Sequence, residues 1–241
     1  MTIIQAVGVV WRGRIALSIA RRVSGAADRR KAILERIARA AAAAKRDPAD
    51  VQLIAVSKGR SPEEIEPLIE AGQHDFGENR VQEALAKWPE LLARNSNVRL
   101  HAIGRLQSNK AAEAVKLFDV LHSVDRRSLL DALAREAEKT ARTPTLYVQV
   151  NIGEEEQKGG CAIGDVGELV EAVRSSPLPL AGLMAIPPLG LEAAPFFALL
   201  AKLARRHDVT SLSIGMSSDF EAAVMLGATA VRIGTALFED E

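Results

Sequence analysis

Short apolar runs alternate with amphipathic segments along most of the chain. The first run, Val51 to Val56, is rich in branched residues and leads into Ser57-Lys58. Ser61-Pro62-Glu63-Glu64 follows, with a capping serine, a proline at the first helical position and acids in the first turn, which predicts a helix start. The repeated alternation predicts strands over 51–58, 74–79, 98–104, 120–124, 145–152, 180–186, 211–215 and 230–233, and helices over 28–45, 62–71, 81–93, 109–117, 127–139, 166–174, 195–206 and 219–226.

Strict alternation of strand and helix favours parallel strands joined by right-handed crossovers. Eight strands in a chain of this length predict an α/β protein with one domain over residues 28–241, a (β/α)8 TIM barrel with an extra N-terminal helix before the first strand. A doubly wound open sheet is the alternative. The barrel is favoured because no G-x-G-x-x-G motif opens the first helix and the strands follow one another without a long break.

The N-terminal segment differs in composition from the rest of the chain. It carries arginine at positions 12, 14, 21, 22, 29 and 30, and no acidic residue precedes Asp28. We interpret residues 1–27 as an extension outside the barrel domain that is flexible and contributes little to it. A mitochondrial-type presequence and an ordered additional helix are the alternatives.

Composition narrows the class of protein. The 31 basic and 31 acidic residues give a net charge of zero, which argues against nucleic acid or an anionic membrane as a partner. No apolar run reaches the length of a bilayer span. Cys161 is the single cysteine, which excludes an intrachain disulfide and favours a reducing, cytoplasmic location. The four histidines lack metal-ligand spacing, so we predict no metal site.

Candidate chemistry gathers where the predicted strands end, which is the catalytic face of such barrels. Lys58 is an amine at the end of the first strand; it is either an ordinary solvated strand end or a Schiff-base lysine. Gly215 and Ser217 follow the seventh strand and Gly234-Thr235 the eighth, where barrels often bind phosphate. Arg232 lies two residues before Gly234, where it could face the ring nitrogen of a cofactor. Together these groups would suit pyridoxal 5'-phosphate (PLP).

Longer motifs strengthen this interpretation. The chain contains Ala55-Val56-Ser57-Lys58, Phe76-Gly77-Glu78-Asn79-Arg80-Val81-Gln82-Glu83, His101-Ala102-Ile103-Gly104-Arg105-Leu106-Gln107-Ser108-Asn109-Lys110, Gly182-Leu183-Met184-Ala185-Ile186-Pro187, Ser213-Ile214-Gly215-Met216-Ser217-Ser218-Asp219 and Val231-Arg232-Ile233-Gly234-Thr235. With these motifs it resembles the pyridoxal phosphate homeostasis protein family, the single-domain relatives of the alanine racemase barrel. The resemblance extends from about Asp28 to Phe238. Arg105 departs from it, since the family usually has proline there, and Gly159-Gly160-Cys161 forms a looser turn.

The resemblance implies a set of cofactor-binding residues. Lys58 would hold PLP as a Schiff base, Arg232 would face the pyridine nitrogen, and Asn79 would lie beside the ring. The phosphate would be held at the ends of the last two strands by Met216, through its backbone N–H, and by Ser217, Gly234 and Thr235. Lys158 could make a secondary cofactor contact.

The expected function is that of a carrier. The resemblance implies a PLP-binding protein, not an enzyme, that buffers PLP for vitamin B6 homeostasis and passes it to PLP-dependent apo-enzymes, as a monomer or weak dimer. An arginine stays protonated and disfavours a protonated ring nitrogen, which handicaps amino-acid chemistry. Tyr147, the only tyrosine, lies within a strand, away from the strand ends. A PLP-dependent amino-acid racemase and a Schiff-base aldolase remain the alternatives.

Overall fold

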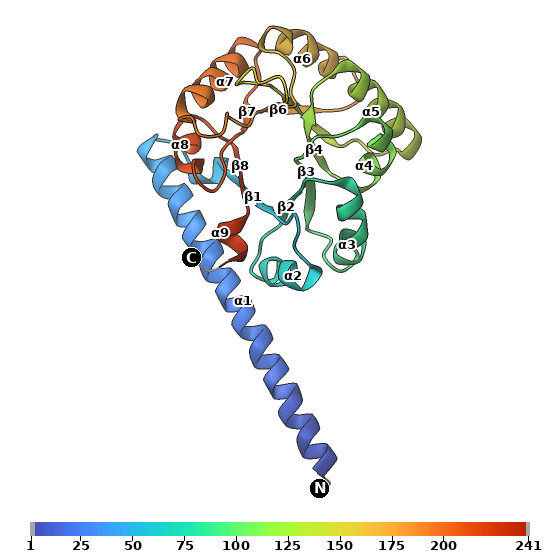
Figure 1. Cartoon of the computed structure of the whole chain (residues 1–241), viewed down its shortest axis with the longest axis vertical. Helices are drawn as coiled ribbons and strands as arrows, with labels where there is room; N and C mark the ends of the chain where they lie inside the picture. The colour runs from blue at the N-terminus through green and yellow to red at the C-terminus, as the bar shows by residue number, and fades with distance from the viewer. Residues whose placement is uncertain (1–2, 240–241) are drawn as a thin grey trace.

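The chain forms a closed barrel of eight parallel strands in the order β1 to β8, as the sequence predicts. This computed structural model describes residues 3–239, with side chains from Val23 onward. The strands are β1 (Gln52–Val56), β2 (Asp75–Glu78), β3 (Arg99–Ala102), β4 (Val120–Val124), β5 (Thr145–Gln149), β6 (Leu180–Met184), β7 (Ser211–Ser213) and β8 (Ala230–Ile233). The barrel closes through β1 and β8, where Leu53 is in register with Val231 (Figure 1).

Helices surround the strands. They are α1 (Ile3–Ala43), α2 (Pro62–Glu70), α3 (Val81–Arg94), α4 (Ala111–Leu117), α5 (Arg127–Thr140), α6 (Val166–Arg174), α7 (Ala194–Arg206), α8 (Phe220–Met225) and α9 (Thr235–Phe238). Short 3-10 turns cover Pro48–Asp50, Ser108–Lys110 and Ile163–Asp165. The predicted start of α2 is confirmed, because Ser61 and Glu64 form a reciprocal capping box before Pro62.

The apolar core lies mainly between the strands and the helices. Phe76, Trp88 and Phe220 are among its largest fully buried side chains. Inside the barrel, by contrast, the apolar cluster is small and consists of Val120, Tyr147 and Met184. TIM barrels usually fill this space with branched aliphatic residues. Here several polar side chains are buried as well, and they lead toward one end of the barrel.

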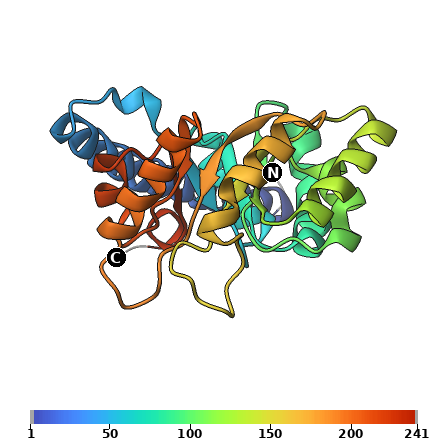
Figure 2. The ribbon, with the colours of Figure 1, turned by 90° about the horizontal axis from the view of Figure 1, so that it is seen from above.

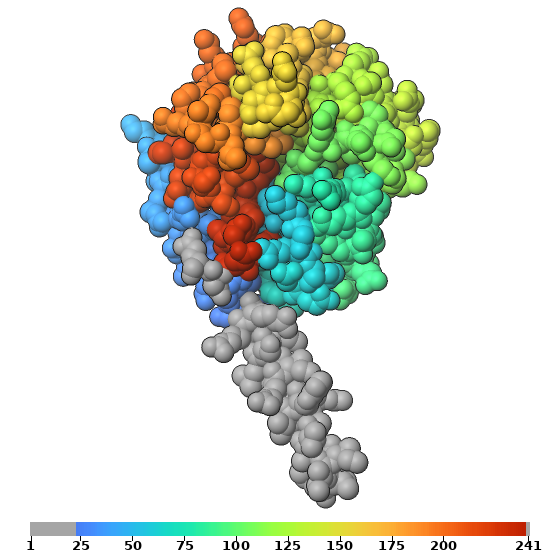
Figure 3. Space-filling model, in the orientation of Figure 1, coloured from blue at the N-terminus to red at the C-terminus, as the bar shows by residue number. Residues whose placement is uncertain are grey.

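The N-terminal helix is longer than the predicted helix over 28–45. It begins at Ile3, and its C-terminal half packs against α2, α8 and α9. Arg36 forms an ion pair with Glu221 at 3.0 Å, and Arg29 donates to the carbonyl of Leu237. In the space-filling view, the C-terminal segment (red) lies between α1 (blue) and the α2 region (cyan) (Figure 3). The predicted boundary at residue 27 therefore falls inside a helix; residues 1–2 and the side chains before Val23 lie outside the described part.

Six strands, β1, β2, β3, β5, β6 and β7, end one to three residues earlier than predicted. β1 ends at Val56, because Ser57 to Arg60 form a turn in which Gly59 has a φ of 71°. β5 ends at Gln149, and the chain then enters a long loop. Figure 2 shows two loops, coloured yellow and orange like the segments after β5 and β6, that project from one face of the barrel. Within the described residues, the helices include none with the length and apolar character needed to cross a membrane.

Candidate functional site

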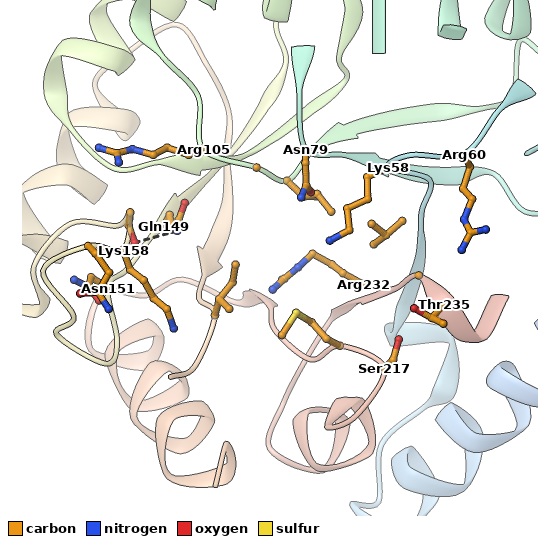
Figure 4. Close-up of a pocket in the computed structure, with 18 residues that line it drawn as sticks. Lys58, Arg60, Asn79, Arg105, Gln149, Asn151, Lys158, Ser217, Arg232 and Thr235 are labelled. Atoms are coloured by element: carbon orange, nitrogen blue, oxygen red, sulfur yellow. Dashed lines mark hydrogen bonds between the residues drawn. The ribbon is translucent and has the colours of Figure 1, made fainter. Parts of the chain in front are cut away.

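A cavity of about 560 Å³ opens at the carboxyl ends of the strands. It is lined by all seven residues that the sequence analysis assigned to cofactor binding, which come from the segments after β1, β2 and β7 and from β8 and its end. They are Lys58, Asn79, Met216, Ser217, Arg232, Gly234 and Thr235. Figure 4 shows the side chains of Lys58 and Arg232 pointing into the same space, with Ser217 and Thr235 close together at another part of the wall.

The charge of the cavity wall contrasts with the zero net charge of the chain. Five basic residues line it, namely Lys58, Arg60, Arg105, Lys158 and Arg232. Among the described residues, the lining set contains no aspartate or glutamate. Two of these cations have acidic partners just outside the lining: Arg60 pairs with Glu64 and Lys158 with Glu155. The wall is nevertheless strongly cationic, so the cavity is suited to an anionic ligand.

Lys58 lies in the turn after β1, and its side chain is exposed to the cavity. The backbone on both sides of it is held by hydrogen bonds. Lys87 Nζ donates to the carbonyls of Ser57 (2.7 Å) and Arg60 (3.1 Å). The amide of Gly59 donates to Glu83. The side chain of Lys58 is thus exposed to the cavity on a backbone that hydrogen bonds hold in place.

A buried ionic network stands behind this turn. Glu78 is fully buried, and its Oε1 accepts hydrogen bonds from the Ser57 hydroxyl (2.6 Å) and the Trp88 indole (3.0 Å). The ammonium of Lys87 lies 2.9 Å from the same oxygen. A buried carboxylate requires such a partner, because desolvation of an isolated charge is very costly. The network therefore ties the turn after β1 to β2 and α3, next to Lys58 in the chain.

Arg232 is buried, with 4% of its surface exposed, and burial lowers its pKa to about 10. It therefore stays protonated at neutral pH. Its Nη1 donates to the carbonyl (2.6 Å) and the hydroxyl (2.7 Å) of Ser213, and its Nη2 donates to the carbonyl of Ala185 (3.1 Å). These bonds within the described residues use three of the five donors of a guanidinium. For the other two N–H groups the described residues record no hydrogen bond, and Arg232 lines the cavity.

The turns after β7 and β8 form a wall of small and hydroxylated residues. Gly215 has a φ of 94°, and a Cβ on it would lie 2.6 Å from the Cβ of Ala223, so the tight turn requires glycine. The hydroxyls of Ser217 and Thr235 face the cavity beside Gly234. The backbone N–H of Met216 already donates to Asp219 Oδ1 at 2.6 Å. A phosphate that used this N–H would have to replace that bond.

Some residues of the wall, Arg60 and Gln149 among them, have no role predicted from the sequence. Arg60 follows Lys58 in the same turn, and its spacing gave no signal of its own. Gln149, at the end of β5, donates to the carbonyl of Gly159 at 3.1 Å and so fixes the loop that carries Lys158. Lys158, which the sequence suggested as a secondary cofactor contact, points its side chain into the cavity, and Arg105, the departure from the family pattern, lies at the exposed outer edge (Figure 4).

Two other candidates for chemistry lie elsewhere. Cys161 is buried, and burial raises the pKa of its thiol to about 12, so it is a poor nucleophile. Among the described residues, no cluster of histidine, cysteine and carboxylate side chains could hold a metal ion. Tyr147 lies in β5, where its ring stacks on that of His122 with centroids 4.4 Å apart, and it is outside the cavity lining.

Comparison of the sequence with known protein families gives one match over most of the chain, the alanine racemase N-terminal domain, over residues 29–241. A pyridoxal phosphate homeostasis protein of Pseudomonas aeruginosa is 45% identical over 214 residues, which cover 86% of this chain and 91% of that protein. A protein of the same description from Escherichia coli is 38% identical and covers 86% and 92%. These relatives are named for PLP homeostasis and not for an enzymatic reaction.

Solved structures agree with the sequence matches. PipY of Synechococcus elongatus with PLP bound is 40% identical, covers 86% of this chain and all of PipY, and gives a TM-score of 0.73. An alanine racemase of Clostridium difficile is 15% identical with a TM-score of 0.66; it covers 89% of this chain and 57% of the racemase and shows the barrel alone. This chain therefore belongs to the pyridoxal phosphate homeostasis protein family, and its fold is the alanine racemase N-terminal barrel.

Proposed function

We propose that this protein binds PLP reversibly through Lys58, buffers its concentration and passes it to PLP-dependent apo-enzymes. The observation that carries the proposal is the cavity wall, where a free primary amine shares a cationic space with Arg232 and the hydroxyls of Ser217 and Thr235. PLP supplies an aldehyde that a primary amine can capture, and a phosphate that hydroxyl and cationic groups can hold. PLP bound to PipY, at 40% identity, supports the same ligand here.

Each residue has a distinct task in this proposal. Lys58 captures the aldehyde, and Ser217 and Thr235 donate hydrogen bonds to the phosphate beside Gly234, where the absence of a side chain leaves the backbone open. Arg232 donates to the ring nitrogen and keeps a positive charge at that position. A ring nitrogen that faces a protonated arginine resists protonation, so the bound cofactor withdraws electrons weakly.

The composition of the wall favours a carrier over a racemase. Racemisation needs proton-transfer groups on both faces of the cofactor. The described residues that line the cavity include no carboxylate, histidine, tyrosine or cysteine. Lys158 is the one further amine, and it is engaged by Glu155 (2.5 Å) and the carbonyl of Pro187 (3.2 Å). A Schiff-base aldolase would take its carbonyl from the substrate, so a purified protein that carries bound PLP would count against that alternative.

Substitution of Lys58 tests the proposal. We expect the spectrum of purified wild-type protein to contain the visible absorption band of a PLP Schiff base. Lys58→Ala should lack that band. Borohydride reduction followed by peptide mass spectrometry should find the label on Lys58. Lys110→Ala, which removes a lysine outside the cavity that pairs with Glu113, should retain the band. A wild-type label confined to another lysine would refute the assignment.

The phosphate contacts can be tested separately. The double variant Ser217→Ala, Thr235→Val removes both hydroxyl donors with little change in volume. Because hydrogen bonds to a charged group each contribute about 1.5–3 kcal/mol, loss of both should raise the Kd for PLP at least about a hundredfold. The Kd for pyridoxal, which lacks the phosphate, should change by less than about twofold. An equal rise in Kd for PLP and pyridoxal would show that the phosphate does not bind at Ser217 and Thr235.

A further inference from the structure

A line of buried polar side chains crosses the interior of the barrel and ends at Arg232. His101 on β3 bonds Asp75 Oδ1 through Nε2 (3.0 Å) and His122 Nε2 through Nδ1 (2.9 Å). His122 on β4 bonds the hydroxyl of Ser213 through Nδ1 (2.9 Å). Ser213 in turn accepts from Arg232 Nη1 (2.7 Å). Four successive hydrogen bonds thus join a carboxylate at the start of β2 to the guanidinium of the cavity.

The chemistry of the two ends fixes the direction of every bond in the line. An ionised carboxylate only accepts, so His101 must carry its proton on Nε2 and accept at Nδ1. His122 must then carry its proton on Nε2 and accept at Nδ1. The Ser213 hydroxyl therefore donates to His122, and its lone pairs face Arg232, which only donates. With both histidines neutral, every donor in the line meets an acceptor.

Burial keeps the histidines in this neutral form. His101, His122 and Ser213 are each no more than 1% exposed. Burial lowers the pKa of His101 even though Asp75 opposes that shift, and burial, with the nearby His101 and Arg232, lowers the pKa of His122 well below its usual value. Burial also opposes ionisation of Asp75, but its hydrogen bond from His101, with further partners, outweighs this effect and lowers the pKa of Asp75.

We infer that Asp75, His101, His122 and Ser213 are positioning residues for Arg232. Asp75 sets a single direction for the hydrogen bonds of the line, which holds the lone pairs of Ser213 toward the guanidinium. The remaining N–H donors of Arg232 are thereby directed into the cavity. This inference rests on the proposed function, because the donors matter only if a ligand acceptor meets them. The ring contacts agree with a fixed arrangement, since the ring of His122 stacks on that of Tyr147 while its Nε2 bonds His101.

The substitution Asp75→Asn removes the constraint on the direction of the hydrogen bonds and keeps the shape of the side chain. Its amide can donate to His101 Nε2 as well as accept from it, so the line loses the constraint that fixes both tautomers. If the direction reverses, His122 donates to Ser213, and the serine proton is left to compete with the donors of Arg232. Asp119→Asn is the matched control. Asp119 lies at the same end of the barrel and accepts from the amide of Leu100 (2.8 Å) and from Arg142 (2.9 Å), outside the line.

The tautomers can be measured in the protein without PLP. Nitrogen-15 NMR of the four histidines, with His101→Gln and His122→Gln for assignment, should find both line histidines neutral and protonated at Nε2 near neutral pH. Asp75→Asn should populate a form of His122 protonated at Nδ1, and Asp119→Asn should not. A wild-type His122 protonated at Nδ1, or identical spectra of wild type and Asp75→Asn, would overturn the inference.

PLP affinity gives the second measurement. We expect Asp75→Asn to raise the Kd for PLP about tenfold, and Asp119→Asn to change it by less than about twofold. A tautomer change without a change in Kd would overturn the positioning role. If wild-type protein failed to bind PLP, the proposed function would fail, and the NMR result would still decide whether the line has its inferred direction.

Discussion

Lys87→Met should lower the free energy of unfolding by about 3–5 kcal/mol, because removal of one partner of a buried ion pair leaves the other charge uncompensated. Glu78 is fully buried, and without Lys87 the donors that the described residues give its carboxylate are two neutral groups, the Ser57 hydroxyl and the Trp88 indole. For a domain of this size the loss corresponds to a decrease of roughly 6–20 °C in Tm. Denaturant unfolding followed by circular dichroism would measure it.

The same change should weaken ligand binding, because the ammonium of Lys87 also holds the carbonyls of Ser57 and Arg60. The matched control is Lys139→Met, which removes an exposed partner of Glu136 and should cost less than about 1 kcal/mol. The double variant Glu78→Gln, Lys87→Met should recover part of the lost stability, because the remaining side chain is neutral. Equal unfolding free energies for Lys87→Met and its control would refute this account of the network.

Gly104→Ala should destabilise the protein by about 3 kcal/mol, at the upper end for an added methyl group. A Cβ at Gly104 would collide with the backbone carbonyl of Asn79, and backbone cannot rotate away as a flexible side chain can. The segment after β2 would have to move, and both Gly104 and Asn79 line the cavity. We therefore also expect a higher Kd for PLP, measured by loss of absorbance on dilution.

Gly164→Ala provides the comparison. A Cβ there would have no atom within 4 Å, and Gly164 has no left-handed φ. The free energy of unfolding of the Gly164→Ala variant should differ from that of wild type by less than about 0.5 kcal/mol, as is usual for surface substitutions. Equal midpoints of denaturant unfolding for Gly104→Ala and Gly164→Ala would contradict the close approach of Gly104 to the backbone of Asn79.

Much of the fold could be predicted because the apolar pattern changes its period at each boundary. β4, α6 and β8 have the bounds that the sequence predicts. The errors lie at ends that depend on turns, as at Val56, where the branched run continues into Ser57-Lys58 but Gly59 in a left-handed conformation turns the chain. α1 begins earlier than predicted, because the arginine-rich composition of residues 1–27 was interpreted as an extension outside the barrel domain.

The supporting structure of the site could not be predicted in the same way. Lys58 and Arg232 stand at strand ends, and barrel geometry brings strand ends together. Glu78 and Lys87, by contrast, look like ordinary charges, the first at the end of a short strand and the second on a helix. Their burial depends on how α3 packs over β2. His101 and His122 are 21 residues apart, and only the adjacency of β3 and β4 makes them partners.

The helix α1 contacts elements from both ends of the barrel sequence, α2 on one side and α8 and α9 on the other. β1 likewise pairs with β8, the last strand. During synthesis, two of the helices that pack against α1, namely α8 and α9, therefore emerge late, and the surface of α1 stays incompletely covered until they do. Contacts that join distant parts of a sequence form slowly. The nascent chain should consequently remain dependent on chaperones until the final strand and short helix are in place.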